Sequence, residues 1–243
     1  MRRIKLVLDY VGTRYHGWQL QPGKDTVQKR LEEALSSLCK EEIHVVASGR
    51  TDSGVHAVGQ VVHFDTNTAY ELVAYVRGTN NYLPDNIRVL KAEEVPDDFH
   101  ARFSAKRKTY VYVMYEGKEE RAIYANRAIR IDKIDTKKME EACKYLLGEH
   151  DFASFMSTGS DVKTTTRTVY RAELIQKDGT YEFYVCANGF LYNMVRKIVA
   201  SLLRVGTGKM SVEEFKARVD FPDINSLPYV APASGLYLLS VEY

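Results

Sequence analysis

Residues 43–64 read IHVVASGRTDSGVHAVGQVVHF. The two ends of this stretch, 43–47 and 59–64, are rich in valine and are typical of β-strands. The polar residues 48–54 lie between them and include Gly49 and Gly54, which allow tight turns and the close approach of another molecule. The stretch therefore predicts two strands joined by a polar loop that carries Asp52.

The residues on either side extend this pattern into a first half of the chain. Residues 4–10 alternate as a strand does, and Asp25 opens a capping-box pattern ahead of an apolar stripe at helical spacing. A second helix is expected over 69–81 and a strand over 87–90. The order strand, helix, strand, strand, helix, strand is typical of a ferredoxin-like arrangement.

The second half repeats this order loosely, although no residue-level repeat is visible. Strands are expected at 109–115, 169–176, 181–187 and 236–241, and helices after Asp135 or Thr136 and over 190–205. Asp178-Gly179 separates two of these strands and is a strong hairpin signal. The sequence thus predicts an α+β fold of two ferredoxin-like (RRM-like) halves, 1–104 and 105–243. We expect the halves to share one continuous, mainly antiparallel sheet with flanking helices.

The bulk composition indicates a soluble globular protein. Hydrophobic residues make up 45% and charged residues 27% of 243 positions, and no apolar run approaches the ~20 residues that cross a bilayer. The expected location is therefore the cytoplasm, without a membrane. The three cysteines are far apart and the six histidines form no ligand-like pair, so we expect reduced thiols and no metal site.

The formal net charge is only +2, but the basic residues gather in two groups. These are Arg102 with Lys106, Arg107 and Lys108, and Arg196 with Lys197. A nearly neutral protein can still present one basic face to phosphates. A solvated surface of mixed charges explains the same pattern equally well.

The loop around Asp52 is the first candidate site. Thr51, Asp52 and Ser53 could simply bond to their own backbone, but such a turn does not explain the adjacent Arg50. The spacing excludes a nucleophile elbow, and the chain has no P-loop pattern or EF-hand ligand set.

The predicted helix over 190–205 supplies a second candidate, Arg196, which has apolar neighbours on more than one side. An unpaired buried charge costs several kcal/mol or more, so a buried guanidinium would need a carboxylate, and the loop of Asp52 is the natural place to look. A side chain that extends to the surface is the alternative.

The strand that follows the basic residues 106–108 supplies a third candidate. Tyr110 and Tyr112 lie on one face of it, because alternate residues of a strand point the same way. Basic residues followed by tyrosines suit phosphate contact and base stacking. In a chain with 17 tyrosines, amphipathic filling of a sheet is a serious alternative.

Together these features resemble one family over nearly the whole chain. The segment at 49–57 is similar to the G-R-T-D-x-G-V-H-A signature of the tRNA pseudouridine synthase A family. Five further motifs follow that family's order: YxG with YHGWQxQ at 10–21, FHARFSA at 99–105, DFASF at 151–155, GFL with MVR at 189–196, and APAxGL at 231–236. Ser53 stands where members commonly carry Ala, a small departure.

The resemblance implies a role for each matching residue. Asp52 corresponds to the catalytic aspartate, Tyr110 to the tyrosine that stacks on the target base, and Arg196 to the arginine that pairs with the aspartate. Substrate binding is expected from Arg50, which holds the target nucleotide out of the stack, and from Thr51, His56, Lys106, Arg107 and Lys108.

The implied reaction converts uridine to pseudouridine in the anticodon stem-loop of tRNA, at positions 38, 39 and 40, by a homodimer without a cofactor. The target base must be flipped out to be reached. The carboxylate of Asp52 could attack C1′ or C6 of the nucleotide or support a glycal route. The rival interpretations are a non-catalytic RNA-binding module and an enzyme acting on a small nucleotide.

Overall fold

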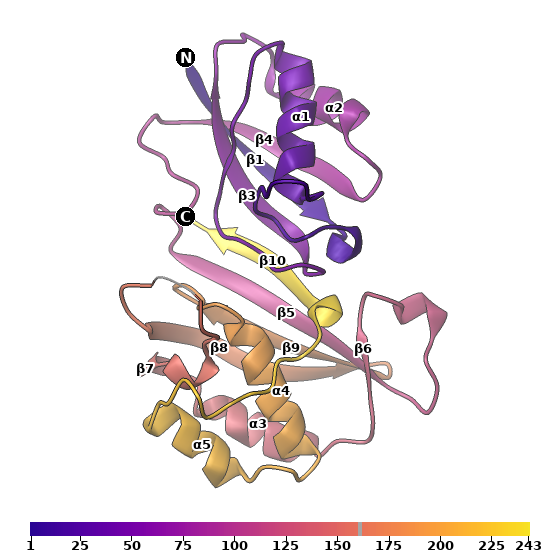
Figure 1. Cartoon of the computed structure of the whole chain (residues 1–243), viewed down its shortest axis with the longest axis vertical. Helices are drawn as coiled ribbons and strands as arrows, with labels where there is room; N and C mark the ends of the chain where they lie inside the picture. Colours follow the sequence, from indigo (N-terminus) through magenta and orange to yellow (C-terminus); the bar gives the residue numbers. More distant parts are fainter. Residues whose placement is uncertain (160–161) are drawn as a thin grey trace. The chain divides into compact units, whose positions relative to one another are not determined.

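The structure, a computed structural model, describes residues 1–159 and 162–243 (Figure 1). It divides into two compact units, Met1–Lys106 with Tyr237–Tyr243, and Arg107–Leu236. This division differs from the expected halves, 1–104 and 105–243, by residues 105 and 106 and by the last strand. Strand β10 (Leu236–Glu242) pairs in parallel with β3 (His56–Thr66), so the end of the chain joins the first unit.

The sheet of the first unit is mainly antiparallel. Strand β1 pairs antiparallel with both β3 and β4, and the short β2 pairs with β3. The remaining bounds are β1 (Arg2–Tyr10), β2 (Val46–Ala47) and β4 (Ile87–Val95). The alternation read from residues 4–10 is confirmed, because Ile4, Leu6 and Leu8 are fully buried on one face of β1.

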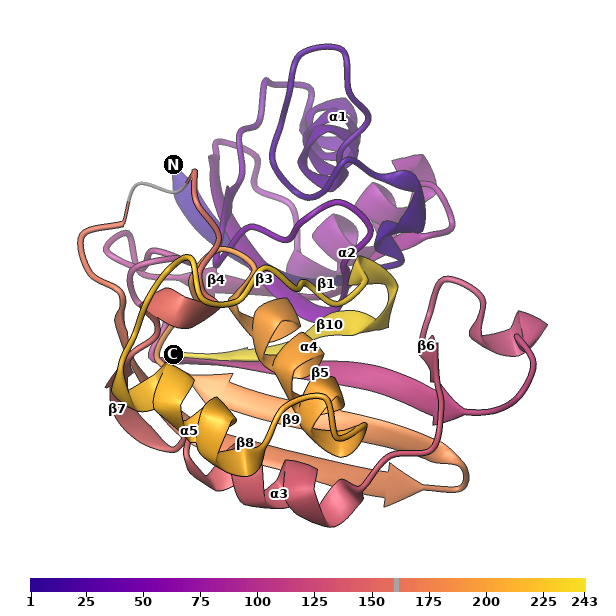
Figure 2. The same cartoon turned by 60° about the horizontal axis from the view of Figure 1, so that its bottom comes forward.

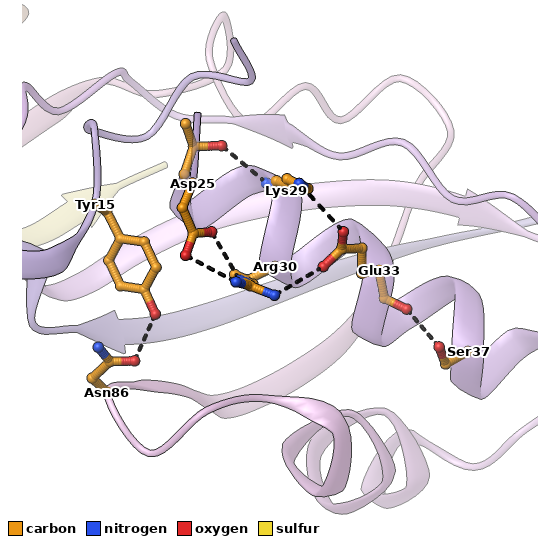
Figure 3. Close-up of polar contacts among 8 residues, drawn as sticks. Tyr15, Asp25, Lys29, Arg30, Glu33, Ser37 and Asn86 are labelled. Carbon is orange, nitrogen blue, oxygen red and sulfur yellow. Dashed lines mark hydrogen bonds and ion pairs between the residues drawn. The ribbon is translucent and has the colours of Figure 1, made fainter. Parts of the chain in front are cut away.

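Two helices, α1 (Val27–Cys39) and α2 (Leu72–Tyr82), pack against each other (Figure 1). The expected capping box is wrong, because Thr26 is the N-cap of α1 and accepts from the Lys29 N–H at 3.3 Å. The carboxylate of Asp25 instead accepts hydrogen bonds from Nε and Nη2 of Arg30, at 2.8 and 2.9 Å (Figure 3).

The strand expected at 43–47 shrinks to the two residues of β2. The N–H groups of Ile43 and Val45 donate to side chains of α1, namely Oγ of Ser36 and Oε1 of Glu32. Backbone donors that are bound by side chains are not available to a neighbouring strand, so the ladder is short.

In the second unit, β9 pairs antiparallel with both β5 and β8, and β8 pairs antiparallel with β7. The short β6 pairs in parallel with β5. The bounds are β5 (Arg107–Glu116), β6 (Ile129–Ile131), β7 (Gly148–Asp151), β8 (Thr166–Lys177) and β9 (Thr180–Ala187). The hairpin predicted at Asp178-Gly179 is confirmed, with φ of 41° and 82° as a type I′ turn requires.

Three helices lie together in this unit: α3 (Thr136–Lys144), α4 (Met194–Gly206) and α5 (Val212–Asp220) (Figure 2). Asp135 is the N-cap of α3, as expected. Helix α4 begins four residues later than the predicted start at 190, because Asn193 has a left-handed backbone with φ 60°. Helix α5 was not predicted, although Ser211 and Glu214 form a complete capping box at its start.

Short 3-10 turns complete the chain: η1 (Gly12–Arg14), η2 (Ala122–Tyr124), η3 (Ala153–Phe155) and η4 (Ala233–Gly235). The mixture of helices with mainly antiparallel strands agrees with the predicted fold class. The ferredoxin-like detail of both halves and the continuous sheet stay predictions.

The three cysteines are free and buried. Within residues 1–159 and 162–243, no helix combines the length and apolar character that a membrane span requires. The same residues contain no group of His, Cys, Asp or Glu side chains that could hold a metal ion.

Candidate active site

Asp52 lies half-buried on the loop that leads into β3, and the residue before it is tied to β1. The hydroxyls of Thr51 and Tyr10 share a buried hydrogen bond of 2.8 Å. Burial raises the pKa of Tyr10 to about 12, so this phenol stays neutral. The side chain of Gln60 donates to the carbonyl of Gly49 at 2.9 Å. The stem of the loop is thus held by polar contacts from two strands.

The segment after β1 packs directly on the same loop. A Cβ on Gly12 would lie 1.9 Å from the carbonyl oxygen of Val55, and one on Gly17 would lie 2.7 Å from that of Thr51. Gly17 also has φ +82°, which an L side chain rarely adopts, and the Trp18 N–H donates to the Thr51 carbonyl at 3.0 Å. The glycines at 12 and 17 therefore allow backbone to touch backbone beside Asp52.

His56 supports this contact. Its Nδ1 accepts from the Gly12 N–H at 3.0 Å, so the neutral ring carries its proton on Nε2. The ring stacks on Tyr237, with centroids 4.6 Å apart, and is 1% exposed. The side chain of His56 is thus part of the structure that holds the loop, and its expected part in substrate binding stays a prediction.

Further contacts fix the tip of the loop. Ser53 Oγ donates to the carbonyl of Tyr15 at 3.1 Å, and the Tyr15 hydroxyl donates to Asn86 at 2.6 Å (Figure 3). The Val55 N–H donates to the Asp52 carbonyl at 3.1 Å. The catalytic candidate is therefore carried by a backbone anchored on both sides.

Arg50 differs from its neighbours in the loop. Its side chain is exposed, and it has no hydrogen bond or ion pair to any other part of the chain that the structure describes. Such a guanidinium can donate to a phosphate or a base without first breaking an internal contact.

Tyr110 and Tyr112, the two tyrosines of β5, have different surroundings. Tyr110 is 8% exposed and meets the ring of Phe190 edge-on, with centroids 4.9 Å apart. Tyr112 is fully buried, its hydroxyl donates to the carbonyl of Pro232 at 2.7 Å, and burial raises its pKa. A fully buried ring cannot stack on a base, so Tyr112 fills the interior and only Tyr110 remains a candidate.

Arg196 lies in the first turn of α4 and is half-buried. Its Nε donates to the carbonyl of Ala231 at 2.7 Å, and its Nη1 donates to Oδ1 of Asn193 at 2.9 Å. The Ala231 N–H donates back to the Arg196 carbonyl at 3.1 Å. Two neutral oxygens therefore orient the guanidinium within its own unit, and the sequence did not single out either residue as a partner of Arg196.

The basic residues 106–108, just before and in the first two positions of β5, differ in their exposure. Lys106 and Arg107 are exposed, and Lys108 is half-buried. The guanidinium of Arg107 lies 4.4 Å from the ring centroid of Tyr170, a cation–π distance. An exposed charge beside an exposed ring is a suitable contact for single-stranded RNA.

The candidate residues divide between the two units. Asp52 with Arg50, Thr51, His56 and Lys106 belongs to the first unit, and Tyr110 and Arg196 with Arg107 and Lys108 belong to the second. Within the second unit the structure joins two of the predicted motifs, at 189–196 and 231–236, through Arg196.

Comparisons with known proteins identify the family. The family profile described as tRNA pseudouridine synthase matches residues 6–104 and 142–243. A tRNA pseudouridine synthase A of Ruminiclostridium cellulolyticum is 42% identical over 245 residues, covering all of both chains. The protein of that name from Bacillus licheniformis is 44% identical over 99% of each chain, and tRNA pseudouridine synthase A 2 of Clostridium perfringens is 42% identical over all of both. With matches of this length and identity, the chain belongs to the tRNA pseudouridine synthase A family.

Proposed function

We propose that this enzyme isomerises uridine to pseudouridine in the anticodon stem-loop of tRNA, at positions 38, 39 and 40, with Asp52 as its nucleophile. The observation that carries the proposal is the anchored loop at 48–57. Its backbone is held by the segment after β1, while the carboxylate-bearing residue at its tip is half-buried and not in the core. A rigid support of this kind is what a precisely placed reacting group needs.

The reaction balances within one nucleotide. The C1′–N1 glycosidic bond breaks, a C1′–C5 bond forms, the proton on C5 leaves to solvent, and N1 gains a proton. Nothing is oxidised or reduced, so the chemistry requires no cofactor. The aspartate has to be ionised to act as a nucleophile or to stabilise positive charge that develops on the sugar.

Tyr110 and Arg196 are proposed to complete the site with Asp52. Tyr110 is proposed to offer its ring to the extruded base, and its edge-on contact with the Phe190 ring limits its rotation. The guanidinium of Arg196 is proposed to pair with the Asp52 carboxylate, an interaction that keeps a carboxylate ionised where water is scarce. Its two contacts to neutral oxygens set the plane of that guanidinium, and because neither acceptor is charged, they do not neutralise it.

RNA binding is proposed for the basic residues of both units. Arg50 would hold the flipped nucleotide, because it is exposed and lies on the catalytic loop, two residues before Asp52. Lys106, Arg107 and Lys108 would contact phosphates, and Thr51 and His56 would act mainly by shaping the loop. The family resemblance further supports a homodimer that works on tRNA in the cytoplasm.

The test is a substitution at Asp52 in the full-length protein. Asp52→Asn keeps the shape of the side chain and removes the nucleophile, so we expect tRNA binding close to wild type and no release of tritium from tRNA labelled at C5 of uridine. Asp98→Asn is the matched control, because Asp98 is exposed and lies on a different loop. Full tritium release by Asp52→Asn would show that Asp52 is not the nucleophile.

The wild-type protein decides between the rival functions in the same assay. Binding of tRNA without tritium release would favour a non-catalytic RNA-binding module. Turnover of free uridine or UMP would favour an enzyme of small nucleotides, whereas the proposal expects turnover only of folded RNA.

A further inference from the structure

The turn that precedes α4 uses an asparagine in an unusual way. Asn193 is the N-cap of the helix, where asparagine ordinarily accepts a hydrogen bond from an N–H of the first turn. Its side chain makes no such bond, and its backbone is left-handed, with φ 60° and ψ 7°. The amide is directed elsewhere.

The amide of Asn193 bridges Arg196 and a neighbouring segment. Its Oδ1 accepts from Nη1 of Arg196 at 2.9 Å, and its Nδ2 donates to Oγ of Ser157 at 3.1 Å. Because a guanidinium only donates, the oxygen of the amide has to face it, which settles the orientation of the amide group. Ser157 is itself held, since its N–H donates to the carbonyl of Tyr192 at 3.0 Å.

These contacts restrain the guanidinium at two separate points. Nε donates to the carbonyl of Ala231 at 2.7 Å, and Nη1 donates to Asn193. A planar group held at two different nitrogens has a defined plane, whereas a group held at one nitrogen can pivot about that contact. Removal of the amide would therefore take away one of the contacts that define this plane.

We infer that Asn193 is a positioning residue, which sets the plane of the Arg196 guanidinium for the reaction. The inference rests on the proposed role of Arg196 beside Asp52. The position imposes two demands, a left-handed backbone and a neutral acceptor aimed at Nη1. Glycine satisfies only the first, and most side chains with an acceptor disfavour the first.

The test replaces Asn193 with glycine, which accepts the left-handed backbone and lacks the amide. The matched control is Asn126→Gly, because Asn126 is also left-handed, with φ 58°, and is exposed on a different loop. For Asn193→Gly we expect kcat for tritium release to fall about tenfold or more, the scale of one lost hydrogen bond to a charged group. We expect KM for tRNA to stay within about twofold and the melting temperature to follow that of the control. Asn126→Gly should leave both kinetic constants unchanged.

Ser157→Ala tests the second contact of the Asn193 amide, the hydrogen bond from its Nδ2 to Oγ of Ser157. It removes the acceptor for Nδ2 of Asn193, so a smaller loss in kcat is expected, again without a change in KM. The double variant Asn193→Gly/Ser157→Ala should be no slower than Asn193→Gly alone, because residues that act in series are not additive.

The kinetics of the variants test the positioning role of Asn193, and the activity of the wild-type protein tests the proposed function. Wild-type kcat in Asn193→Gly, while the wild-type protein forms pseudouridine, would overturn the positioning role and leave the proposed function standing. A loss of kcat that is matched by Asn126→Gly, or that comes with a lowered melting temperature absent from the control, would also overturn it. A wild-type protein without tritium release would refute the proposed function itself.

Discussion

Gly17→Ala tests the contact that holds the catalytic loop. The added Cβ would lie 2.7 Å from the Thr51 carbonyl oxygen and 3.1 Å from the Asp52 carbonyl carbon, both backbone atoms. Gly23→Ala is the matched control, because Gly23 also has positive φ, at +70°, but a Cβ there would meet nothing within 4 Å. Both variants strain the backbone, but only the alanine at position 17 would clash with the loop that carries Asp52.

The magnitude follows from the geometry. A left-handed alanine costs roughly 1–2 kcal/mol at either site. At Gly17 ordinary contact begins at 3.4 Å, so the loop has to retreat by about 0.7 Å, which adds roughly 1–3 kcal/mol of overpacking. A displacement of about 1 Å at a reacting group can lower turnover by roughly a hundredfold. We therefore expect Gly17→Ala to lose about 2–5 kcal/mol of unfolding free energy and at least tenfold in kcat.

Urea denaturation measures the first quantity, and tritium release from C5-labelled tRNA measures the second. Kinetics are recorded under conditions in which both variants are fully folded, so that the loss of kcat reports on the position of Asp52. If Gly17→Ala matched Gly23→Ala in stability and retained wild-type kcat, the close packing of residue 17 on the loop would be refuted.

Two further predictions concern the first unit. Tyr10→Phe removes the buried 2.8 Å hydrogen bond to Thr51, so urea denaturation should show a loss of about 1–3 kcal/mol and kcat should fall; unchanged values would show that this bond does not support the loop. Burial lowers the pKa of His63 from its ordinary value of 6.5 to about 4. The unfolded chain therefore takes up the proton first, and stability should fall as pH drops from about 6.5 towards 4, by about 1–3 kcal/mol. His63→Gln should flatten the pH dependence of the unfolding free energy in that window; an equally steep profile would assign the effect to other groups.

Much of the local structure was predictable because it depends on neighbouring residues. The buried face of β1, the N-cap at Asp135 and the turn at Asp178-Gly179 follow from alternation, capping and positive φ, each set within a few residues. The predictions were wrong where a different hydrogen bond from the expected one formed. Thr26, and not Asp25, is the N-cap of α1. Side chains of α1 accept the backbone N–H groups that were expected to extend the strand β2.

The sequence by itself identified the family, the fold class and the residues proposed for catalysis, because a nine-residue signature and five ordered motifs carry that information without coordinates. It also indicated that one of two same-face tyrosines could stack on a base. Periodicity alone does not separate Tyr110 from Tyr112, because both lie on one face of the strand; the resemblance selected Tyr110, and the structure shows that Tyr112 is fully buried.

Only the tertiary structure decided how the candidate residues are held. The glycines at 12 and 17 lie more than thirty positions from the loop that they contact, and Arg196 is oriented by Ala231, 35 residues further along the chain. No local pattern encodes such contacts, because they arise when distant segments pack and their backbone donors and acceptors must find partners. Asn193 lies only three residues from Arg196, and its contact depends on a left-handed turn at a position that the sequence placed inside a helix.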